Sequence, residues 1–341
     1  MSKLTVRIVV LLLLTVLFIS CVYDDVGGCL SEKAELTIAF APTDYIDAKV
    51  SSRSAEVKTR ALATTEEMQL NNVYIILFST TAAPLKYFVE TTTNTPDLKW
   101  IAGTEYNQVK IYPKDVSNNY MTLSAVGLRN VYVIGNVNAT LKGALDDVNM
   151  DTETELAAVL TTTEDPWTIS ITSALGLLME GHTGTGHDFA TNYIAGPISL
   201  TRAVAKVKIN VKLAAPFQSS VHTDYGYKYL NFGKETYILE KADAQTTGIV
   251  DSHTDWQTAG FTFTPATGTV IDLSLTTYIN EYKNTSSTDP TATIELRLPF
   301  NNNDGMLPPP EFGDGYETHR LVMPLQVVRN TYYEYDVEIT K

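Results

Sequence analysis

The stretch TATIELRL, residues 291–298, alternates apolar and polar side chains along its length. Its three large aliphatic residues, Ile294, Leu296 and Leu298, fall on one face of an extended chain. Its two charged residues fall on the opposite face. Because a period of two residues is the pattern of a half-buried strand, this stretch predicts a β-strand that packs one face against a core.

Runs of similar length and composition recur along the chain. They are LTIAF at 36–40, VYIILF at 73–78, VYVIG at 131–135, VAKVKINV at 204–211 and YEYDVEI at 333–339. The chain also contains 19 Tyr and 11 Phe, which pack well on a pleated surface. Helical pattern is scarce, and its best candidate is one or two short helices within 141–160. Many short strands separated by turns predict an all-β fold of packed sandwiches.

Changes in composition indicate how the strands are divided. The 341 residues suit one large β-domain or two of ordinary size. Residues 44–65 are polar and lack an apolar period, so we predict an exposed linker there. Pro197 precedes the strongly patterned segment ISLTRAVAKVKINVKL at 198–213, which we predict to be a strand. This pattern places a domain junction near residue 196.

The first residues have the pattern of a secretory signal peptide. Lys3 and Arg7 precede an apolar run at 8–19 that is too short to span a bilayer as a helix. The run ends at Ser20-Cys21, which resembles a bacterial lipobox, where the thiol is acylated and becomes the new N-terminus. Acylation of Cys21 would anchor the mature chain to a membrane without a transmembrane helix. The alternative is an ordinary secreted protein in which Cys21 is incidental.

Charge and cysteine content exclude several kinds of partner and site. The net charge is −14, and it becomes −16 when Lys3 and Arg7 are lost with the signal peptide. So acidic a surface repels nucleic acid, which we therefore exclude as a partner. The chain has only two cysteines, Cys21 and Cys29. If Cys21 carries lipid, no disulfide and no paired-cysteine metal site can form, so stability must come from apolar burial.

No set of residues indicates catalysis, so we expect no enzyme. The nearest candidate for a metal site is His182 and His187 with Glu180 and Asp188. These histidines flank a loop rich in Gly and Thr, where solvated histidines are the commoner outcome. No GxSxG sequence is present to indicate a hydrolase nucleophile. We expect no metal and no cofactor.

Five segments occur in a particular order along the chain. They are the signal ending at Cys21, KTRALATTEEMQLNNVYIILFS at 58–79, VYVIGNVN at 131–138 followed by LKGALDDV, ISLTRAVAKVKINV at 198–211, and VVRNTYYEYDVEI at 327–339. Each segment by itself is a common strand sequence, but the ordered set resembles the fimbrillin family, the lipoprotein-derived (type V) pilins of Bacteroidales. The likeness covers nearly the whole chain.

The resemblance implies two tandem transthyretin-like β-sandwich domains, with a short helical segment in the first, and a structural role in surface fimbriae. It implies a signal peptide at 1–20, an N-terminal strand and cleavable linker at 21–60, and sandwiches at 61–196 and 197–341. The expected partners are other fimbrial subunits, in a homo- or hetero-polymer, and the outer membrane through the lipid anchor before processing. The expected location is the exposed face of the outer membrane and then the fimbrium.

A strand is predicted immediately before the polar linker. In EKAELTIAFAP, residues 32–42, the side chains of Leu36, Ile38 and Phe40 point one way. If this strand completes the first sandwich and the linker is cut, the strand can leave. The sandwich would then have an apolar groove with unpaired backbone groups, which a strand from another chain could fill.

The cut is predicted between Arg60 and Ala61, which with the following segment are similar to the family's processing site. Arg53 is a rival position. The segment YDDVGGC at 23–29 is similar to the start of the family's anchor subunits, which keep the lipid and need no cut. The family's shaft pilins carry a further donor segment after the closing strand, whereas this sequence stops at Lys341. We therefore expect a minor or tip component, unless the last strand doubles as donor.

The alternative function is that of a surface-anchored glycan-binding lipoprotein. Such a protein would stack sugars on Trp100, Trp167, Trp256 or the tyrosine-rich stretch YGYKYL at 225–230. That stretch is better explained as a strand with a face of tyrosines. Removal of the residues before Ala61 would distinguish the two functions. A pilin would lose stability and capture a partner's strand, whereas a glycan binder would lose only its tether.

Overall fold

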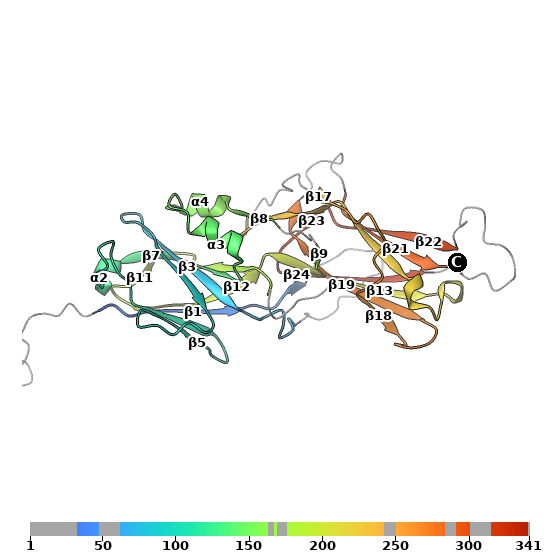
Figure 1. Cartoon of the computed structure of the whole chain (residues 1–341), viewed down its shortest axis with the longest axis horizontal. Helices are drawn as coiled ribbons and strands as arrows, with labels where there is room; N and C mark the ends of the chain where they lie inside the picture. Colours follow the sequence, from blue (N-terminus) through green and yellow to red (C-terminus); the bar gives the residue numbers. More distant parts are fainter. Residues whose placement is uncertain are drawn as a thin grey trace, which may run out of the picture.

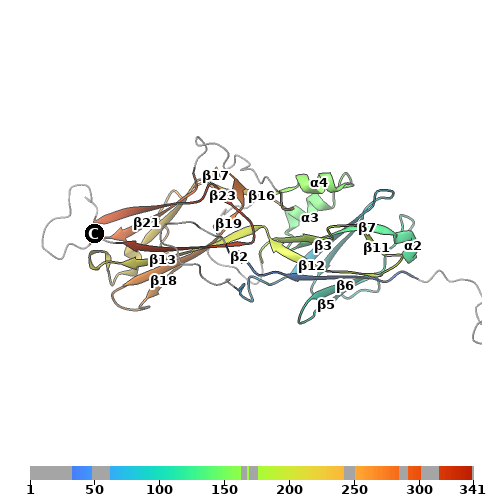
Figure 2. The same ribbon diagram turned by 180° about the vertical axis from the view of Figure 1, so that it is seen from behind.

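The computed structural model describes residues 33–47, 62–162, 167–168, 176–241, 250–283, 291–300 and 315–339. Figure 1 shows the strands gathered in two sandwiches that lie end to end along the long axis. Figure 2 gives the opposite view, in which β12 (Ile194–Arg202) and β2 (Ile46–Asp47) lie where the two sandwiches meet. The predicted all-β fold of two tandem sandwiches is confirmed.

The first sandwich is one continuous path of strands in the order β4-β3-β7-β10-β12-β1-β6-β5. Besides β12, its strands are β1 (Leu36–Pro42), β3 (Asn72–Phe78), β4 (Leu85–Glu90), β5 (Leu98–Ile101), β6 (Asn107–Ile111), β7 (Leu128–Gly135) and β10 (Met179–His182), with β11 (His187–Asp188) paired to β7. The path folds over at β12, because the first part of this strand pairs with β1 while Thr201 and Arg202 pair with β10. The two resulting layers enclose one apolar core.

Two short helices cover the outer face of this sandwich. They are α3 (Ala139–Leu145) and α4 (Glu153–Ala158), while α2 (Leu123–Val126) lies at the far end. Asn138 caps α3, and Thr152 with Glu155 forms a capping box on α4. The helices pack on the outward side chains of β3 and β7 in a separate apolar cluster. This cover explains why VYIILF is apolar at every position, and it confirms the predicted short helices within 141–160.

The second sandwich packs a long sheet against a three-stranded one. The long sheet runs β18-β19-β13-β24-β2, and the short sheet runs β14-β21-β22. The bounds are β13 (Val204–Leu213), β18 (Phe261–Thr264), β19 (Asp272–Asn280), β24 (Thr331–Ile339), β14 (Gly226–Leu230), β21 (Thr293–Pro299) and β22 (Tyr316–Val322), and β9 (Trp167–Thr168) pairs with β19. The stretch TATIELRL forms β21, whose Ile294, Leu296 and Leu298 are at most 2% exposed. The predicted buried apolar face of this strand is confirmed, but Glu295 on the opposite face is also buried at 7% exposure.

Small pairings complete the described structure. They are β15 (Phe232–Gly233) with β17 (Val250–Asp251), β20 (Tyr282–Lys283) with β23 (Gln326–Val327), β16 (Glu235–Tyr237) with β8 (Leu160–Thr162), and two 3-10 turns at Ala215–Phe217 and His222–Asp224. The β8–β16 pair links a strand that follows α4, next to the first sandwich, to a strand in the second half of the chain.

The segment 198–213 is not one strand, and that prediction is wrong. It breaks at Ala203, so that β12 belongs to the first sandwich and β13 to the second. The phase of the alternation changes at this point: Ile198, Leu200 and Arg202 are buried at even positions, whereas Ala203 and the buried residues of β13 stand at odd positions. The chain therefore changes sheets at Ala203, while the domain division near residue 196 stays a prediction.

Candidate functional site

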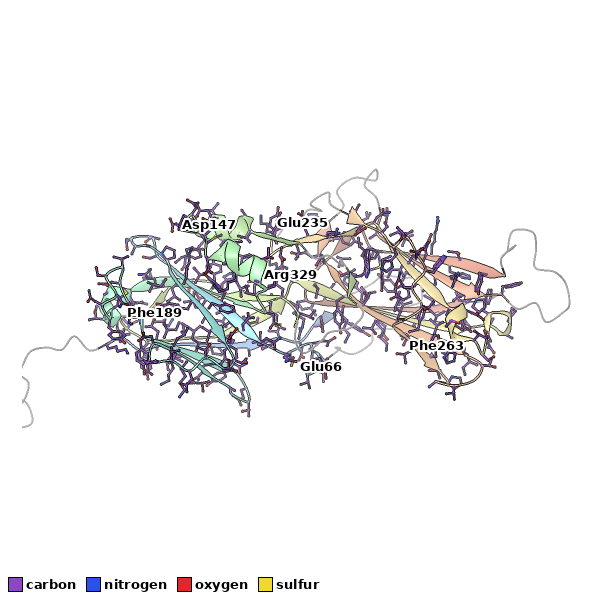
Figure 3. The ribbon with its side chains drawn as sticks, viewed as in Figure 1. Glu66, Asp147, Phe189, Glu235, Phe263 and Arg329 are labelled. Atoms are coloured by element: carbon purple, nitrogen blue, oxygen red, sulfur yellow. The ribbon has the colours of Figure 1, made fainter. Side chains whose placement is uncertain are left out.

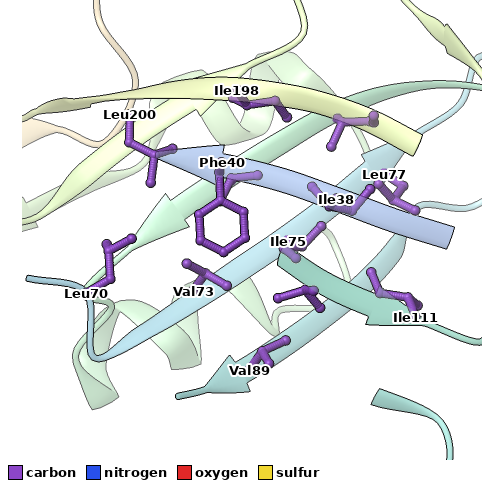
Figure 4. Packing of buried hydrophobic residues seen from close by; sticks show 14 of the residues in the cluster. Ile38, Phe40, Leu70, Val73, Ile75, Leu77, Val89, Ile111, Ile198 and Leu200 are labelled. Atoms are coloured by element: carbon purple, nitrogen blue, oxygen red, sulfur yellow. The ribbon is translucent and has the colours of Figure 1, made fainter. Parts of the chain in front are cut away.

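Strand β1 lies in the middle of a layer, between β12 and β6. Five residue pairs join it to β12 in parallel, and five join it to β6 in antiparallel order. Leu36, Ile38 and Phe40 are each 0% exposed, and Figure 4 shows Ile38 and Phe40 pointing from β1 into the core. We call the apolar surface that these three side chains contact the β1 groove. Its walls include Leu70, Val73, Ile75, Leu77, Val109, Ile111, Ile198 and Leu200.

Two further contacts fix β1 in the groove. The Phe40 ring meets the Trp100 ring edge-on, with the centroids 5.4 Å apart. Beside β1, Gly196 has a φ of 103°, and a Cβ placed there would lie 2.2 Å from the Ala39 carbonyl oxygen. Only glycine allows β12 to approach β1 this closely at that conformation. The predicted pairing of this strand with the first sheet is therefore observed.

A polar group holds the start of β1. The Glu35 carboxylate accepts hydrogen bonds from the Lys110 ammonium and the Tyr112 hydroxyl on the neighbouring β6 region. These two donors hold the pKa of Glu35 below its usual range. Lys33 lies 4.0 Å from the Tyr112 ring centroid and 3.7 Å from that of Tyr120. The contacts are partly exposed, so they contribute less than the apolar side of the strand.

The chain continues from β1 directly into the second sandwich. Thr43 still bonds to Leu200 of β12, whereas β2 pairs in parallel with the start of β24. Tyr45, between them, is 0% exposed. The prediction of an exposed linker from residue 44 is therefore wrong at its first residues, because a single aromatic residue in a polar stretch gives no periodic sign that it is buried.

Tyr45 packs in a pocket at the meeting point of the two sandwiches. We call this site the junction pocket and define it by Glu67, Arg202, Lys206, Tyr278 and Asn330. The Arg202 guanidinium carbon lies 4.4 Å from the Tyr45 ring centroid, and the Lys206 ammonium lies 5.6 Å from it. Cations over an aromatic face are attracted to its ring electrons, most strongly when water is excluded.

Arg202 is the central cation of the junction pocket, and its side chain is 0% exposed. Its Nη1 donates to the Thr43 carbonyl at 2.7 Å and to Asn330 Oδ1 at 2.9 Å, and its Nε donates to the Glu67 carbonyl at 3.0 Å. Its Nη2 is buried and finds no hydrogen-bond partner among the described residues. Burial lowers the pKa of Arg202 from its ordinary value, against the opposing effect of Tyr45 and Glu67.

Glu67 is the anion of the junction pocket, and its side chain lies near Arg202 and Lys206. It is also fully buried. The Lys206 ammonium lies 2.7 Å from its carboxylate, and the Tyr278 hydroxyl and the Thr64 N–H donate to it. Burial alone would raise the pKa of Glu67, but these hydrogen bonds outweigh it and hold the pKa below its usual range. The carboxylate thus stays charged and balances the cations beside it.

Asn330 connects the pocket to the main chain of the segment around Tyr45. Its amide nitrogen donates to Thr43 Oγ1 at 3.2 Å and to the Asp44 carbonyl at 3.0 Å, and its own carbonyl accepts from the Ile46 N–H at 2.8 Å. Its φ of 52° is in the left-handed region, which Asn tolerates better than most residues. The segment 43–46 is therefore held by both sandwiches at once.

A second buried ion group lies nearby. Arg329, which Figure 3 places between the two sandwiches, contacts the Glu281 carboxylate and lies 3.9 Å from that of Glu180 on β10. Its guanidinium also donates to the carbonyls of Tyr237 and Ile238. Burial raises the pKa of Glu281, and Arg329 opposes this. The two sandwiches are joined here without any contribution from β1 or β2.

The predicted lipidation and cleavage residues, Cys21, Arg60 and Ala61, lie outside the described residues, as does Arg53. The described ends of the linker meet at the junction, where Asp44 Oδ1 accepts from the Ala63 N–H at 3.2 Å. No helix within the described ranges is long and apolar enough to cross a membrane.

The histidines of the candidate metal site lie in different strands. His182 on β10 stacks on Tyr132 and lies 3.6 Å from a Glu180 oxygen, which raises the pKa of the imidazole. His187 on β11 bonds instead to the Asn192 carbonyl. Within the part of the chain that the structure describes, no three metal-ligating side chains gather into a group.

Most of the aromatic residues considered for sugar stacking are built into the cores. Trp100 is 9% exposed and packs against Phe40, and Trp167 packs against both Tyr229 and His253. The tyrosines at 225, 227 and 229 are at most 2% exposed, so they form a core face and not a surface platform. Trp256 is half-buried, with Lys228 and Arg297 over its ring.

The junction pocket has no counterpart among the sites that the sequence predicts. One sign was present, because Arg202 occupies the buried phase of an otherwise apolar strand, directly before the phase changes. A charged residue at such a position indicates a buried polar partner. Its partners, however, are far away in sequence and carry no local pattern of their own.

Together these features define a class of protein: a two-sandwich all-β chain whose first sandwich is completed by a strand on the far side of a linker. A model of the C-terminal region of the minor fimbrium tip subunit MfA4 matches residues 203–338. The minor fimbrium tip subunit MfA4 of Porphyromonas gingivalis is 35% identical over 300 residues, which cover 80% of this chain and 82% of that protein. The chain belongs to the MfA4 family of fimbrial subunits, and its predicted place among the Bacteroidales fimbrillins is confirmed.

Solved structures with some similarity include two fimbrial proteins. The tip fimbrial protein Mfa3 of Porphyromonas gingivalis, with a C-terminal truncation, is 12% identical with a TM-score of 0.49, covering 90% of this chain and 95% of that one. A fimbrial assembly protein of Parabacteroides distasonis is 14% identical with a TM-score of 0.44, covering 89% of this chain and 90% of that one.

Proposed function

We propose that this chain is a structural subunit of cell-surface fimbriae that polymerises by donor-strand exchange, in a minor or tip position. It is exported as a lipoprotein acylated on Cys21, reaches the exposed face of the outer membrane, and is cut between Arg60 and Ala61. The relationship to a protein named as a minor fimbrium tip subunit supports both the fimbrial location and the minor or tip position.

The observation that carries this proposal is the place of β1. The strand lies before the linker in sequence, yet it sits between β12 and β6 and fills the β1 groove. A single cut after Arg60 would leave it joined to the rest of the subunit by non-covalent contacts alone. An element so placed can be replaced by an equivalent strand from a second chain, which restores the same backbone pairs and the same buried surface.

The free energy of burying β1 favours its exchange for another strand over its simple release. Each of Leu36, Ile38 and Phe40 stabilises the bound strand by about 1.5–3 kcal/mol through burial, and the paired backbone groups add to this. An emptied groove would expose that apolar surface and two open strand edges, which is unfavourable in water. The arriving strand therefore competes directly with the resident one, and the product is a polymer without covalent links.

Processing is tested by sequencing the N-terminus of protein sheared from the cell surface. We expect mature protein to begin at Ala61, and Arg60→Ala to leave the linker intact and abolish incorporation into fibres. Arg53→Ala is the matched control and should process normally. A mature start at Cys21 in wild-type protein would contradict the proposal and favour an anchor that keeps its lipid.

A further inference from the structure

The segment that would leave with β1 includes more than a strand of the first sandwich. Residues 43–47 pass through the junction pocket and pair with β24 of the second sandwich. All five residues that define the junction pocket lie after Arg60, so they would remain with the subunit. The pocket would then be vacated together with the β1 groove.

If residues 43–47 left the junction pocket, its buried charged groups would lose some of their partners. Arg202 would lose the Thr43 carbonyl and the Tyr45 ring, while its Nη2 already lacks a hydrogen-bond partner among the described residues. A guanidinium that is 0% exposed depends on its partners, and of those of Arg202 only Asn330 and Glu67 would remain to bond it. Asn330 would lose three hydrogen bonds to residues 43, 44 and 46. An equivalent segment from another chain would restore these contacts, so the occupied pocket is more stable than the empty one.

The contacts divide into two kinds with different roles. Thr43, Asp44 and Ile46 each offer a main-chain group to the pocket, which any extended chain could supply. The Thr43 hydroxyl adds hydrogen bonds with Asn330 and with the Leu200 carbonyl. Tyr45 is held through its ring, which has cations on it and is 0% exposed. Ile46, the next residue, is 59% exposed. Within residues 43–46, Tyr45 is therefore the side chain that is fully buried and has cations on its ring.

We propose that the junction pocket is a second recognition site for the partner's strand and that it selects an aromatic side chain. The partner is a fimbrial subunit whose donor strand matches residues 36–40 and continues to a Tyr, Phe or Trp five residues after the position of Phe40. The pocket prefers a ring to an aliphatic side chain because Arg202 and Lys206 interact with ring electrons. This inference rests on the proposed strand exchange and adds to it the partner feature that the second sandwich recognises.

Peptide competition tests this proposal on the full chain without its signal peptide, in which the recognition sequence of a site-specific protease replaces residues 54–60. After cleavage, a fluorescent peptide of residues 33–47 is exchanged into the protein and its anisotropy is measured. Unlabelled competitors are the same peptide, its Tyr45→Phe, Tyr45→Leu and Ile46→Ala forms, and a peptide of residues 33–42. None of these substitutions alters the protein itself, so folding is unaffected.

We expect Tyr45→Phe and Ile46→Ala to compete about as well as the parent peptide. Tyr45→Leu, which keeps an apolar side chain but lacks a ring, and the 33–42 peptide should each compete at least about tenfold less well. Equal competition by the parent, Tyr45→Leu and 33–42 peptides would overturn the junction pocket as a recognition site while leaving strand exchange intact. Failure of the labelled 33–47 peptide to bind at all would overturn strand exchange and, with it, this inference.

Discussion

Glu67 shows at the scale of one residue how the two sandwiches are held. Its carboxylate has no exposed surface and stays charged because Lys206, Tyr278 and the Thr64 N–H donate to it. Since its folded pKa lies below the unfolded value, Glu67 contributes stability that is fully present above about pH 4.3. That contribution is lost as the pH falls through the lowered folded pKa.

Replacing Glu67 by Gln should therefore destabilise the protein in a pH-dependent way. At pH 7, we expect the free energy of unfolding to fall by about 3 kcal/mol, because Lys206 and Arg202 lose a buried counter-charge. The difference between the two proteins should shrink as the pH is lowered from 5 through the lowered pKa of Glu67, because the wild-type carboxylate also becomes neutral there. Urea unfolding at each pH measures this.

Glu66 provides the matched control, since it is adjacent in sequence but exposed, as Figure 3 shows. Glu66→Gln should change the free energy of unfolding by less than about 0.5 kcal/mol at any of these pH values. If Glu67→Gln were as stable as wild type at pH 7, the carboxylate would not be the counter-charge of the junction.

Phe40 tests the β1 groove at the same scale. Phe40→Ala removes a fully buried ring that meets Trp100, so the uncut chain should lose about 3–5 kcal/mol of unfolding free energy. Val116→Ala, at a fully exposed position, should change it by less than about 0.5 kcal/mol. Equal effects of the two substitutions in chemical unfolding would show that β1 is not packed as described.

At the scale of the element, the approach of β1 to β12 depends on one glycine. Gly196→Ala would place a methyl group 2.2 Å from the Ala39 carbonyl oxygen, on a backbone with positive φ. The strand must shift, and we expect a loss of at least about 2 kcal/mol in unfolding free energy together with faster proteolysis near β1.

The control for that change is another glycine-to-alanine substitution. Gly143 lies within α3, and a Cβ there would meet nothing within 4 Å. Gly143→Ala should leave stability unchanged or raise it by up to about 1 kcal/mol, because alanine favours the helix. A Gly196→Ala protein that behaves like Gly143→Ala would be incompatible with the close contact between β1 and β12.

Individual elements also show which parts of the fold can be predicted from sequence. Strands such as β21 are predictable because one buried face imposes a period of two residues. The break at Ala203 was visible as a change of phase, yet an apolar run on both sides made one long strand the simpler interpretation. Helices α3 and α4 were predictable from the leucines spaced among acidic residues in this region.

The junction pocket could not be predicted in this way, because its contacts have no local signature. Arg202 bonds to a residue 128 positions away, and Thr43 to one 287 positions away. Each is a single polar residue within a strand or turn. The topology places them together, because β2 pairs with β24 and β12 is joined directly to β13 at Ala203.

At the scale of the whole molecule, the proposed lipid on Cys21 is what attaches the precursor to the membrane. In cells given a clickable palmitate, wild-type protein should be labelled and should sediment with membranes. Cys21→Ala should lose both properties, because it lacks the thiol that would carry the proposed lipid. Cys29→Ala is the matched control and should remain labelled. Equal labelling of wild type and Cys21→Ala would exclude acylation at this residue.

The meeting of Asp44 with Ala63 has a consequence for the timing of assembly. Because both ends of the linker are fixed at one place, the uncut linker keeps β1 beside its own groove at an effective concentration of the order of millimolar. In the proposed assembly, a neighbouring subunit's strand at lower concentration would not compete with a strand that rebinds before it diffuses away. The proposed cut after Arg60 would convert this intramolecular closure into an ordinary bimolecular equilibrium, in which the number of nearby subunits decides the occupant. On this proposal, the uncut linker would delay assembly until processing.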